Sequence, residues 1–148
     1  MSCLIAFHYR SYGTFFLHKN RLHNIHRGFT HYKYYRAEKS IAFYQDAFGF
    51  KELRRRDFPD HAFTIVYLGL EGDDYELELT YNYDHGPYVV GDGFAHIALS
   101  TPDLEALHQE HSAKGYEVTE PNGLPGTTPN YYFVKDPDGY KVEVIREK

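Results

Sequence analysis

The sequence is poor in cysteine and has no long apolar run. Of its 148 residues, one is cysteine and none is tryptophan. The single thiol, Cys3, excludes an internal disulfide and a zinc site built on cysteine clusters, and it suits a reducing cytoplasm. No apolar run approaches the roughly 20 residues that a membrane-spanning helix needs. We therefore expect a cytoplasmic protein that does not cross a membrane.

The sequence also lacks an excess of basic residues. Its net charge of -5 argues against general binding of nucleic acids, which requires a basic surface. Hydrophobic residues make up 42% of the chain and charged residues 25%, which is the balance of an ordinary globular protein. The 15 Tyr and 11 Phe supply ample core material. Length and composition together predict one domain or two small repeats.

Acidic residues are absent from residues 1–36, which contain six Lys and Arg and five of the ten His. Residues 37–148 hold all 21 Asp and Glu against ten Lys and Arg, a net charge of -11. Three interpretations compete: a targeting leader, a basic arm for an acidic partner, or a segment foreign to the fold, such as one from a shifted reading frame or an upstream start. A leader is disfavoured, because the segment is neither Ser-rich nor apolar enough. We therefore divide the chain into an atypical basic segment, 1–36, either non-native or disordered, and a single domain, 37–148.

The first part of the domain, residues 37–83, predicts one helix and three strands. Residues 37–48 place apolar side chains at helical spacing, and Gly49 supplies a left-handed cap. Strands are predicted over residues 51–58, 61–70 and 75–83. We call this part module one. It lacks a strand before its helix of the kind that begins the second part of the domain.

The second part, residues 91–148, repeats this order and is called module two. A strand over 94–100 precedes a helix for which Thr101 is the expected N-cap and Pro102 the first residue. Gly115 ends this helix. Further strands are predicted near residues 116–119, 130–135 and 140–146.

The spacing of glycine and glutamate indicates an internal duplication. Gly49 precedes Glu78 by 29 residues, and Gly115 precedes Glu143 by 28. Both glutamates lie midway along the last predicted strand of their module. The predicted fold class is therefore α+β, with two paired βαβββ modules that form a curved mixed sheet with a polar inner face.

Three residues on polar strand faces are candidate metal ligands. Glu78 and Glu143 occupy matching positions, and His96 lies on the first strand of module two. A single Glu on a strand is usually solvated, but pairing of the modules would bring these residues together. Two carboxylates in a cavity repel each other, and a divalent cation resolves that repulsion. Imidazole with carboxylates suits zinc, nickel, cobalt or iron.

The duplication also predicts a fourth ligand, on a first strand of module one. His96 lies 19 residues before Gly115, and the residue 19 before Gly49 is Thr30. His31 is the only histidine within three residues of that point. We therefore include His31 as a candidate ligand.

Four blocks of the sequence resemble glyoxalase I, the lactoylglutathione lyases of the vicinal-oxygen-chelate superfamily. The blocks are SIAFYQDAFGF (40–50), YELELTYNYDHG (75–86), GDGFAHIALS (91–100) and DPDGYKVEVIREK (136–148). They occur together and in order, so the resemblance covers about residues 38–148. It implies two paired βαβββ modules and one metal held by two His and two Glu.

The resemblance assigns ligands residue by residue. Glu78, His96 and Glu143 match ligands in these blocks. The family's first ligand is a His early in strand one, and no pattern in residues 1–36 matches it. Its position falls near Phe29, so His31 is the nearest candidate, with His26 second.

The resemblance implies a metal-dependent lyase that detoxifies methylglyoxal. Such an enzyme converts the hemithioacetal of methylglyoxal and glutathione into S-lactoylglutathione by proton transfer through an enediolate. Glu143 would be the catalytic base, Glu78 would remain a ligand, and Asn82 would contact the glutathione. Nickel or cobalt is expected rather than zinc, because the chain lacks the inserts of the longer zinc-type enzymes. A homodimer with sites shared between chains is also implied.

Other functions remain open from the sequence alone. One is another enzyme of the superfamily, such as a thiol transferase, a racemase or an extradiol dioxygenase, although two matching Glu favour glyoxalase over a site with one carboxylate. A second is a metal-free protein that sequesters a small ligand. A third is a metal-poor, inactive chain with an altered N-terminus. A thiol other than glutathione also remains open, because Leu124 and Pro125 stand where the family has a basic residue.

Overall fold

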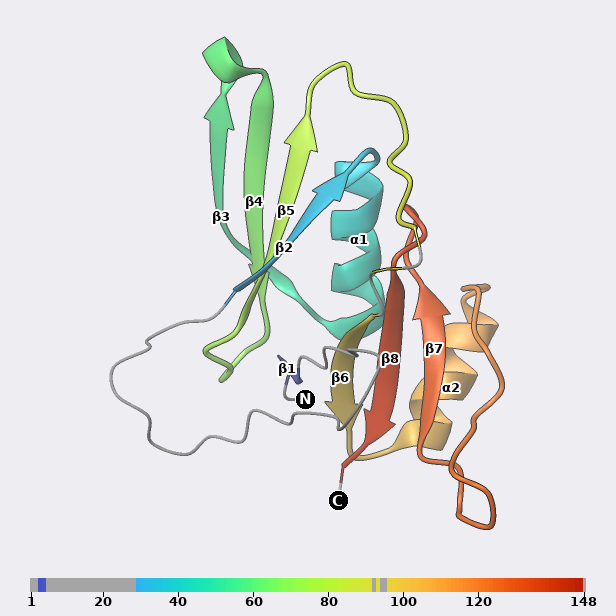
Figure 1. Ribbon diagram of the computed structural model, residues 1–148. Helices are drawn as coiled ribbons and strands as arrows, with labels where there is room; N and C mark the ends of the chain where they lie inside the picture. The colour runs from blue at the N-terminus through green and yellow to red at the C-terminus, as the bar shows by residue number, and fades with distance from the viewer. Residues whose placement is uncertain (1–2, 5–28, 92, 94–95, 148) are drawn as a thin grey trace. The chain divides into compact units, whose positions relative to one another are not determined.

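The computed structural model describes residues 3–4, 29–91, 93 and 96–147. The chain divides into two compact units. The described part of the first unit is residues 29–90, and the second unit combines Cys3–Leu4 with the described residues from Gly91 onward. Each unit holds a four-stranded mixed sheet (Figure 1). The α+β class with two related modules is therefore confirmed. No helix in the described ranges is long and apolar enough to span a membrane.

The first unit contains module one. Its elements are β2 (Phe29–Tyr34), α1 (Ala37–Phe48), β3 (Lys51–Phe58), a 3-10 turn (Pro59–His61), β4 (Phe63–Gly69) and β5 (Glu76–Asn82). The strand order is β2-β5-β4-β3, with β2 parallel to β5 and the other pairs antiparallel. The predicted helix and the three predicted strands agree with α1, β3, β4 and β5 to within two residues at each end.

Strand β2 lies within the basic segment that we separated from the domain. We expected module one to lack a first strand of the family type, but Phe29–Tyr34 form a strand hydrogen-bonded along β5. The boundary expected after residue 36 therefore falls inside the module, between β2 and α1. The physical reason is that a sheet is held by backbone hydrogen bonds, which do not depend on side-chain charge. The candidate His26 lies outside the described residues.

Helix α1 covers one face of this sheet (Figure 1). Ile41, Tyr44 and Phe48 recur at helical spacing and are buried. Gly49 ends the helix with a φ of 72° and donates its backbone N–H to the carbonyl of Gln45 at 3.0 Å, which is the expected left-handed cap. The apolar face of the helix therefore sets which face of the sheet remains available for polar side chains.

Ser40 in α1 is fully buried, and its hydroxyl has no hydrogen-bond partner among the described residues. An unpaired buried hydroxyl costs about 1–3 kcal/mol. We expect Ser40→Ala to raise the free energy of unfolding by about 1 kcal/mol, because Ala removes this cost and favours the helix. Urea denaturation measures the change. Ser112→Ala is the matched control, because the Ser112 hydroxyl donates to the carbonyl of His108 at 2.8 Å. A lower stability of Ser40→Ala would contradict the prediction.

The second unit contains module two. Its elements are β1 (Cys3–Leu4), β6 (Ile97–Thr101), α2 (Leu104–Ala113), β7 (Tyr131–Lys135) and β8 (Lys141–Arg146). The strand order is β1-β6-β8-β7, with β6 parallel to β8 and the other pairs antiparallel. Strands β6, β8 and β7 thus correspond in order and direction to β2, β5 and β4.

Two local predictions for module two differ from the structure. The strand expected over 116–119 is reduced to an isolated bridge between Val118 and Val134 in the described residues, because the backbone N–H of Phe133 donates to the Thr119 side-chain hydroxyl at 2.9 Å and not to a backbone carbonyl. The N-cap of α2 is Asp103, whose carboxylate accepts the backbone N–H of Ala106 at 3.0 Å, and not Thr101. Thr101 is instead the last residue of β6, where pairing with β8 holds its backbone.

A buried His–Tyr pair lies in the core of the second unit. The side chain of His111 on α2 is fully buried, and its Nδ1 lies 3.0 Å from the hydroxyl of Tyr132 on β7. Burial, with a smaller contribution from the charge of Glu110, raises the pKa of Tyr132. Because both polar atoms are satisfied within the core, this histidine has a structural role.

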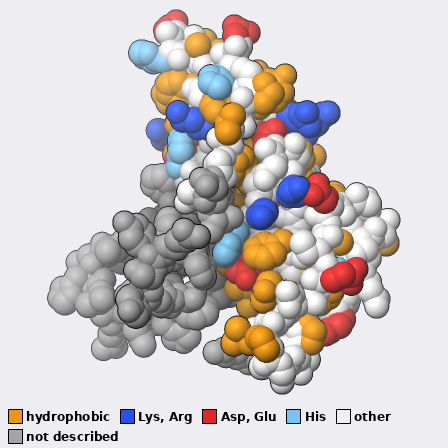
Figure 2. All heavy atoms as spheres, turned by 45° about the vertical axis from the view of Figure 1, so that its right-hand side comes forward, with side chains coloured by type: hydrophobic (Ala, Val, Ile, Leu, Met, Phe, Trp, Pro, Cys, Tyr) orange, Lys and Arg blue, Asp and Glu red, His pale blue; other side chains and the backbone are white. Residues whose placement is uncertain are grey.

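Several ion pairs lie on the surface of the first unit. Arg55 on β3 donates to Glu52 at 3.0 Å and to Glu38 at 2.7 Å. These bonds raise the pKa of Arg55, and the bond from Arg55 lowers the pKa of Glu52. On the face shown in Figure 2, the described Lys and Arg side chains lie among acidic and hydrophobic ones. Exposed pairs of this kind contribute little to stability, so the fold depends on its packed cores.

Candidate metal centre

The first unit brings one candidate His and one candidate Glu together. Parallel pairing of β2 with β5 sets His31 opposite Glu78, and Nδ1 of His31 hydrogen-bonds Oε1 of Glu78. The hydroxyl of Thr80, on the same face of β5, lies 3.4 Å from each of these atoms. The side chain of Glu78 is 7% exposed and that of His31 is 45% exposed. A buried carboxylate is thus held by a solvent-accessible imidazole.

Glu78 has a second partner on the neighbouring strand. Tyr67 on β4 lies opposite Glu78, and a hydrogen bond between the Tyr67 hydroxyl and the carboxylate raises the pKa of Tyr67. The guanidinium carbon of Arg54 on β3 lies 3.6 Å from the centroid of the Tyr67 ring. Arg54 also donates two bonds to Glu76, at 2.7 and 2.6 Å, which raise the pKa of Arg54. Our sequence analysis missed Tyr67, because cross-strand neighbours follow only from the register.

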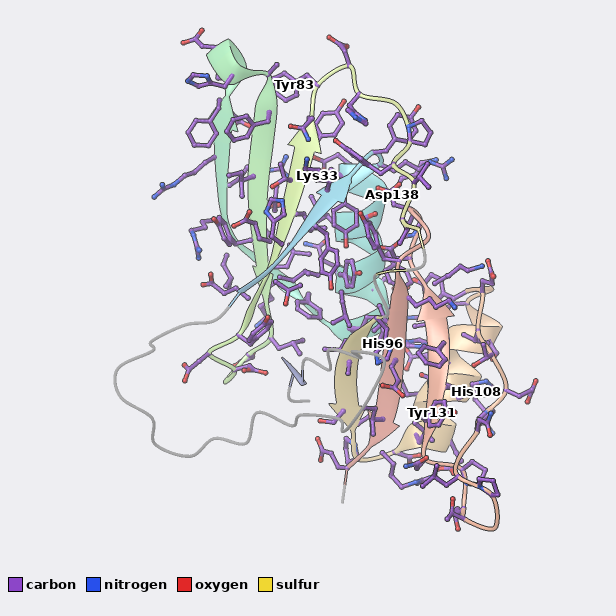
Figure 3. The ribbon with its side chains drawn as sticks, viewed as in Figure 1. Lys33, Tyr83, His96, His108, Tyr131 and Asp138 are labelled. Atoms are coloured by element: carbon purple, nitrogen blue, oxygen red, sulfur yellow. The ribbon has the colours of Figure 1, made fainter. Side chains whose placement is uncertain are left out.

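The second unit holds a corresponding pair. His96 lies directly before β6, beside β8 (Figure 3), and Glu143 lies midway along β8. Nε2 of His96 is 3.0 Å from Oε2 of Glu143, and the side chains are 12% and 16% exposed. The Asp136 carboxylate holds the turn between β7 and β8, because it accepts the backbone N–H of Asp138 and of Tyr140, each at 2.9 Å. This turn fixes the register that presents Glu143.

The Nε2 atom of His96 is buried and lacks a hydrogen bond within the described part of the chain. Although Nε2 lies close to Glu143, the two groups do not form a hydrogen bond, and Nε2 has no other hydrogen-bond partner among the described residues. The ring of Phe133 packs edge-on against the imidazole, with centroids 5.4 Å apart. Buried polar atoms normally have a hydrogen-bond partner. An unpaired ring nitrogen beside a carboxylate oxygen is therefore the arrangement expected when both atoms bind the same third atom.

The two pairs differ in register. His31 lies directly opposite Glu78, whereas Ala98 lies opposite Glu143 and His96 lies two residues earlier. Residues two apart on a strand share a face, so both imidazoles lie on the same face as their glutamate. The ring nitrogen that faces the glutamate also differs, because it is Nδ1 in His31 and Nε2 in His96.

The residue of module one that matches His96 in register is Phe29. It pairs with Glu76, two residues before Glu78. This agrees with the sequence resemblance, which places the first ligand near Phe29. His31 therefore lies two residues further along β2 than the position that corresponds to His96 in module two.

The donor chemistry of both pairs fits a divalent cation. Imidazole nitrogen and carboxylate oxygen are ligands that zinc, nickel and cobalt accept. In the described part of the chain, no group of three or more His, Cys, Asp or Glu side chains gathers. Each unit thus supplies two donors, while protein sites for such metals commonly have three or four protein ligands. The buried, unpaired Nε2 of His96 is the observation that favours a metal over a simple ion pair.

Comparison with known families decides the relationship. The sequence model described as the Glyoxalase/Bleomycin resistance protein/Dioxygenase superfamily matches residues 34–144. The chain belongs to this superfamily. The match begins at the last residue of β2, so the shared region of this glyoxalase-superfamily chain includes α1 and every later strand except the last two residues of β8.

Several curated relatives of this superfamily member are lactoylglutathione lyases. Lactoylglutathione lyase GLX1 of Arabidopsis thaliana is 43% identical over 112 residues, which are 74% of this chain and 40% of the relative. The enzyme of Neisseria meningitidis serogroup A is 41% identical over 114 residues, which are 75% of this chain and 83% of the relative. The chain therefore spans about two fifths of the plant relative and most of the bacterial one.

Solved structures support the same fold. Glyoxalase I from Zea mays aligns with a TM-score of 0.74 at 36% identity, covering 80% of this chain and 43% of that chain. The trypanothione-dependent glyoxalase I of Leishmania major aligns with a TM-score of 0.72 at 30% identity, covering 80% and 84%. An antibiotic-binding protein from Streptomyces, TnmS3, aligns at 0.66 and 20% identity, covering 86% of this chain and all of that chain, and shares the fold alone.

The remaining candidate residue of this glyoxalase-superfamily chain, Asn82, is the last residue of β5. Asn82 is half-buried, and its Nδ2 donates to the hydroxyl of Tyr88 at 2.7 Å. The ring of Tyr88 in turn stacks on His85, with centroids 4.1 Å apart. Asn82 thus ties the loop after β5 to the sheet, while its amide oxygen is a further acceptor.

Proposed function

We propose that this protein is a glyoxalase I, which converts the hemithioacetal of methylglyoxal and glutathione into S-lactoylglutathione. The observation that carries the proposal is the repetition of one chemistry. Each module pairs an imidazole with a carboxylate of its last strand: His31 on β2 with Glu78, and His96, directly before β6, with Glu143. Relatives named lactoylglutathione lyase, about 40% identical over three quarters of the chain, support the choice of reaction.

The proposed metal ligands are the four residues of these two pairs. Together they supply two nitrogen and two oxygen donors to one divalent ion, for which nickel or cobalt is preferred over zinc. When bound, such an ion stabilises the negative charge that develops on substrate oxygen as the adjacent C–H bond breaks. The imidazoles of His31 and His96 hold the ion as neutral donors, and the two carboxylates balance its charge.

Glu143 is the proposed catalytic base. It takes the proton from C1 of the hemithioacetal and returns it to C2, while the hydroxyl proton passes from the oxygen on C1 to the oxygen on C2, so that the reaction is an isomerisation without a redox partner. Among the described residues, Glu143 has only the contact with His96, which is not a hydrogen bond, whereas Glu78 is bonded by His31 and Tyr67. The less restrained carboxylate is the better candidate for a group that must move toward substrate.

The remaining proposals concern the thiol, the assembly and the location. Asn82 contacts the thiol part of the substrate through its amide. The cosubstrate is glutathione, and another low-molecular-mass thiol is the alternative, supported by the trypanothione dependence of the Leishmania relative. Two copies associate as a homodimer in which both chains contribute to each site, and the protein acts in the cytoplasm.

The test is an assay of S-lactoylglutathione formation from methylglyoxal and glutathione. The full chain is stripped with a chelator and reloaded in parallel with nickel, cobalt or zinc. We expect no turnover without metal, and faster turnover with nickel or cobalt than with zinc. Absence of turnover in all three loaded forms, with glutathione and with trypanothione, would contradict the proposed function.

A further inference from the structure

Tyr67 lies between a candidate ligand and a fixed arginine. Strand β4 separates β5 from β3, and the registers set Tyr67 opposite Glu78 on one side and Arg54 on the other. The Tyr67 hydroxyl hydrogen-bonds the Glu78 carboxylate. An ionised carboxylate has no proton to give, so the hydroxyl is the donor. Glu78 therefore receives a directed bond from a neighbouring strand.

Arg54 restrains the ring of Tyr67. Its guanidinium carbon lies 3.6 Å from the ring centroid, within the range of a cation–π contact. Arg54 is itself held by two bonds to Glu76, at 2.7 and 2.6 Å, and the Glu76 side chain is only 8% exposed. A planar fork bound at two points has little freedom to leave the ring. The clamp thus keeps the Tyr67 hydroxyl directed at Glu78.

Module two lacks this support at the matching position. Phe133 on β7 lies opposite Glu143, as Tyr67 on β4 lies opposite Glu78. Phenylalanine has no hydroxyl, so Glu143 receives no bond from its cross-strand neighbour. At this equivalent place in the repeat, Glu78 therefore has an aromatic hydroxyl as its neighbour and Glu143 has none.

We infer that Tyr67 is a positioning residue that holds the Glu78 carboxylate in one orientation and thereby strengthens metal binding. The inference rests on the proposed function, in which Glu78 is a metal ligand. Groups that hydrogen-bond a metal ligand typically contribute about 10- to 100-fold to metal affinity. The clamp of Arg54 and Glu76 acts through Tyr67 and does not touch the ion. The phenylalanine opposite Glu143 leaves that carboxylate free to move.

The test compares Tyr67→Phe with the unmodified chain. Phenylalanine keeps the ring under Arg54 and removes only the hydroxyl. We expect the nickel dissociation constant, measured by competition with a chromogenic chelator, to rise about 10- to 100-fold. A purely structural role would lower the free energy of unfolding of the metal-free protein and leave the nickel dissociation constant unchanged. Tyr116→Phe is the matched control, because the Tyr116 ring packs on His111 in the second unit.

The reciprocal variant Phe133→Tyr keeps the inference falsifiable if Tyr67→Phe does not fold. A hydroxyl opposite Glu143 should restrain that carboxylate, so we expect kcat to fall while nickel affinity stays the same or rises. An unchanged nickel dissociation constant in Tyr67→Phe, or an unchanged kcat in Phe133→Tyr, would overturn the inference and leave the proposed function standing. Failure of the unmodified chain to bind nickel would overturn both.

Discussion

Glu143→Gln is expected to keep its metal and to lose turnover, with kcat falling by about 10²- to 10⁴-fold. The amide matches the carboxylate in shape and retains an oxygen donor, but it cannot accept the substrate proton. The loss should appear in kcat, because substrate binding does not require the base. Steady-state kinetics of the nickel-loaded protein measure kcat, and chelator competition measures the retained metal affinity.

The matched control for this variant is Glu117→Gln. Glu117 belongs to the same unit, and its exposed carboxylate pairs with Lys135 on β7. We expect its kcat to equal that of the unmodified chain. Turnover of Glu143→Gln near that of the unmodified chain would reject Glu143 as the base.

The same substitution at Glu78 should have a different signature. Glu78 is buried and hydrogen-bonded by His31 and Tyr67, so its proposed task is to hold the ion. We expect Glu78→Gln to weaken nickel binding more than Glu143→Gln does. Equal effects of the two variants on both kcat and affinity would show that the restraint on Glu78 does not separate the two roles.

His31→Ala is expected to weaken nickel binding by about 100-fold or more. Loss of a group that merely supports a ligand already costs about 10- to 100-fold, so loss of a ligand should cost at least as much. The effect should be on affinity, and excess nickel should recover part of the turnover. His61→Ala is the control, because His61 is an exposed histidine of the same unit.

The register of β2 permits a sharper version of this experiment. The double variant Phe29→His/His31→Phe moves the imidazole by two residues, to the position that matches His96. Because both positions share a strand face, we expect it to bind nickel more tightly than His31→Ala. An unchanged nickel dissociation constant in His31→Ala would show that His31 is not a ligand. Three proposed metal ligands would then remain.

Much of the fold could be predicted from local sequence signals. The spacing of Ile41, Tyr44 and Phe48 and the glycine that follows define α1 to the residue, because helix period and cap are encoded within a few turns. The first strand was predicted only by the repeat, which placed His31 on it, because the composition of residues 1–36 suggested a segment foreign to the domain. Strand pairing is a long-range property of the backbone, so charge composition is a poor guide to it.

The sequence named the members of the candidate centre, whose role as metal ligands stays a prediction, and it did not predict how they pair. The repeat identified Glu78, Glu143 and His96, and the structure pairs each glutamate with a histidine of its own unit. The two-residue offset of His31 and the support from Tyr67 depend on which residues face each other across strands. A one-dimensional pattern gives the face of a strand but not its register with a neighbour.

The most direct test of the account is anomalous scattering from crystals of the nickel-loaded full chain. The account predicts one nickel peak per site, with His31, Glu78, His96 and Glu143 as ligands at about 2.0–2.2 Å, from one chain or from two. A nickel ion bound by other residues, or by one His–Glu pair without the other, would contradict it.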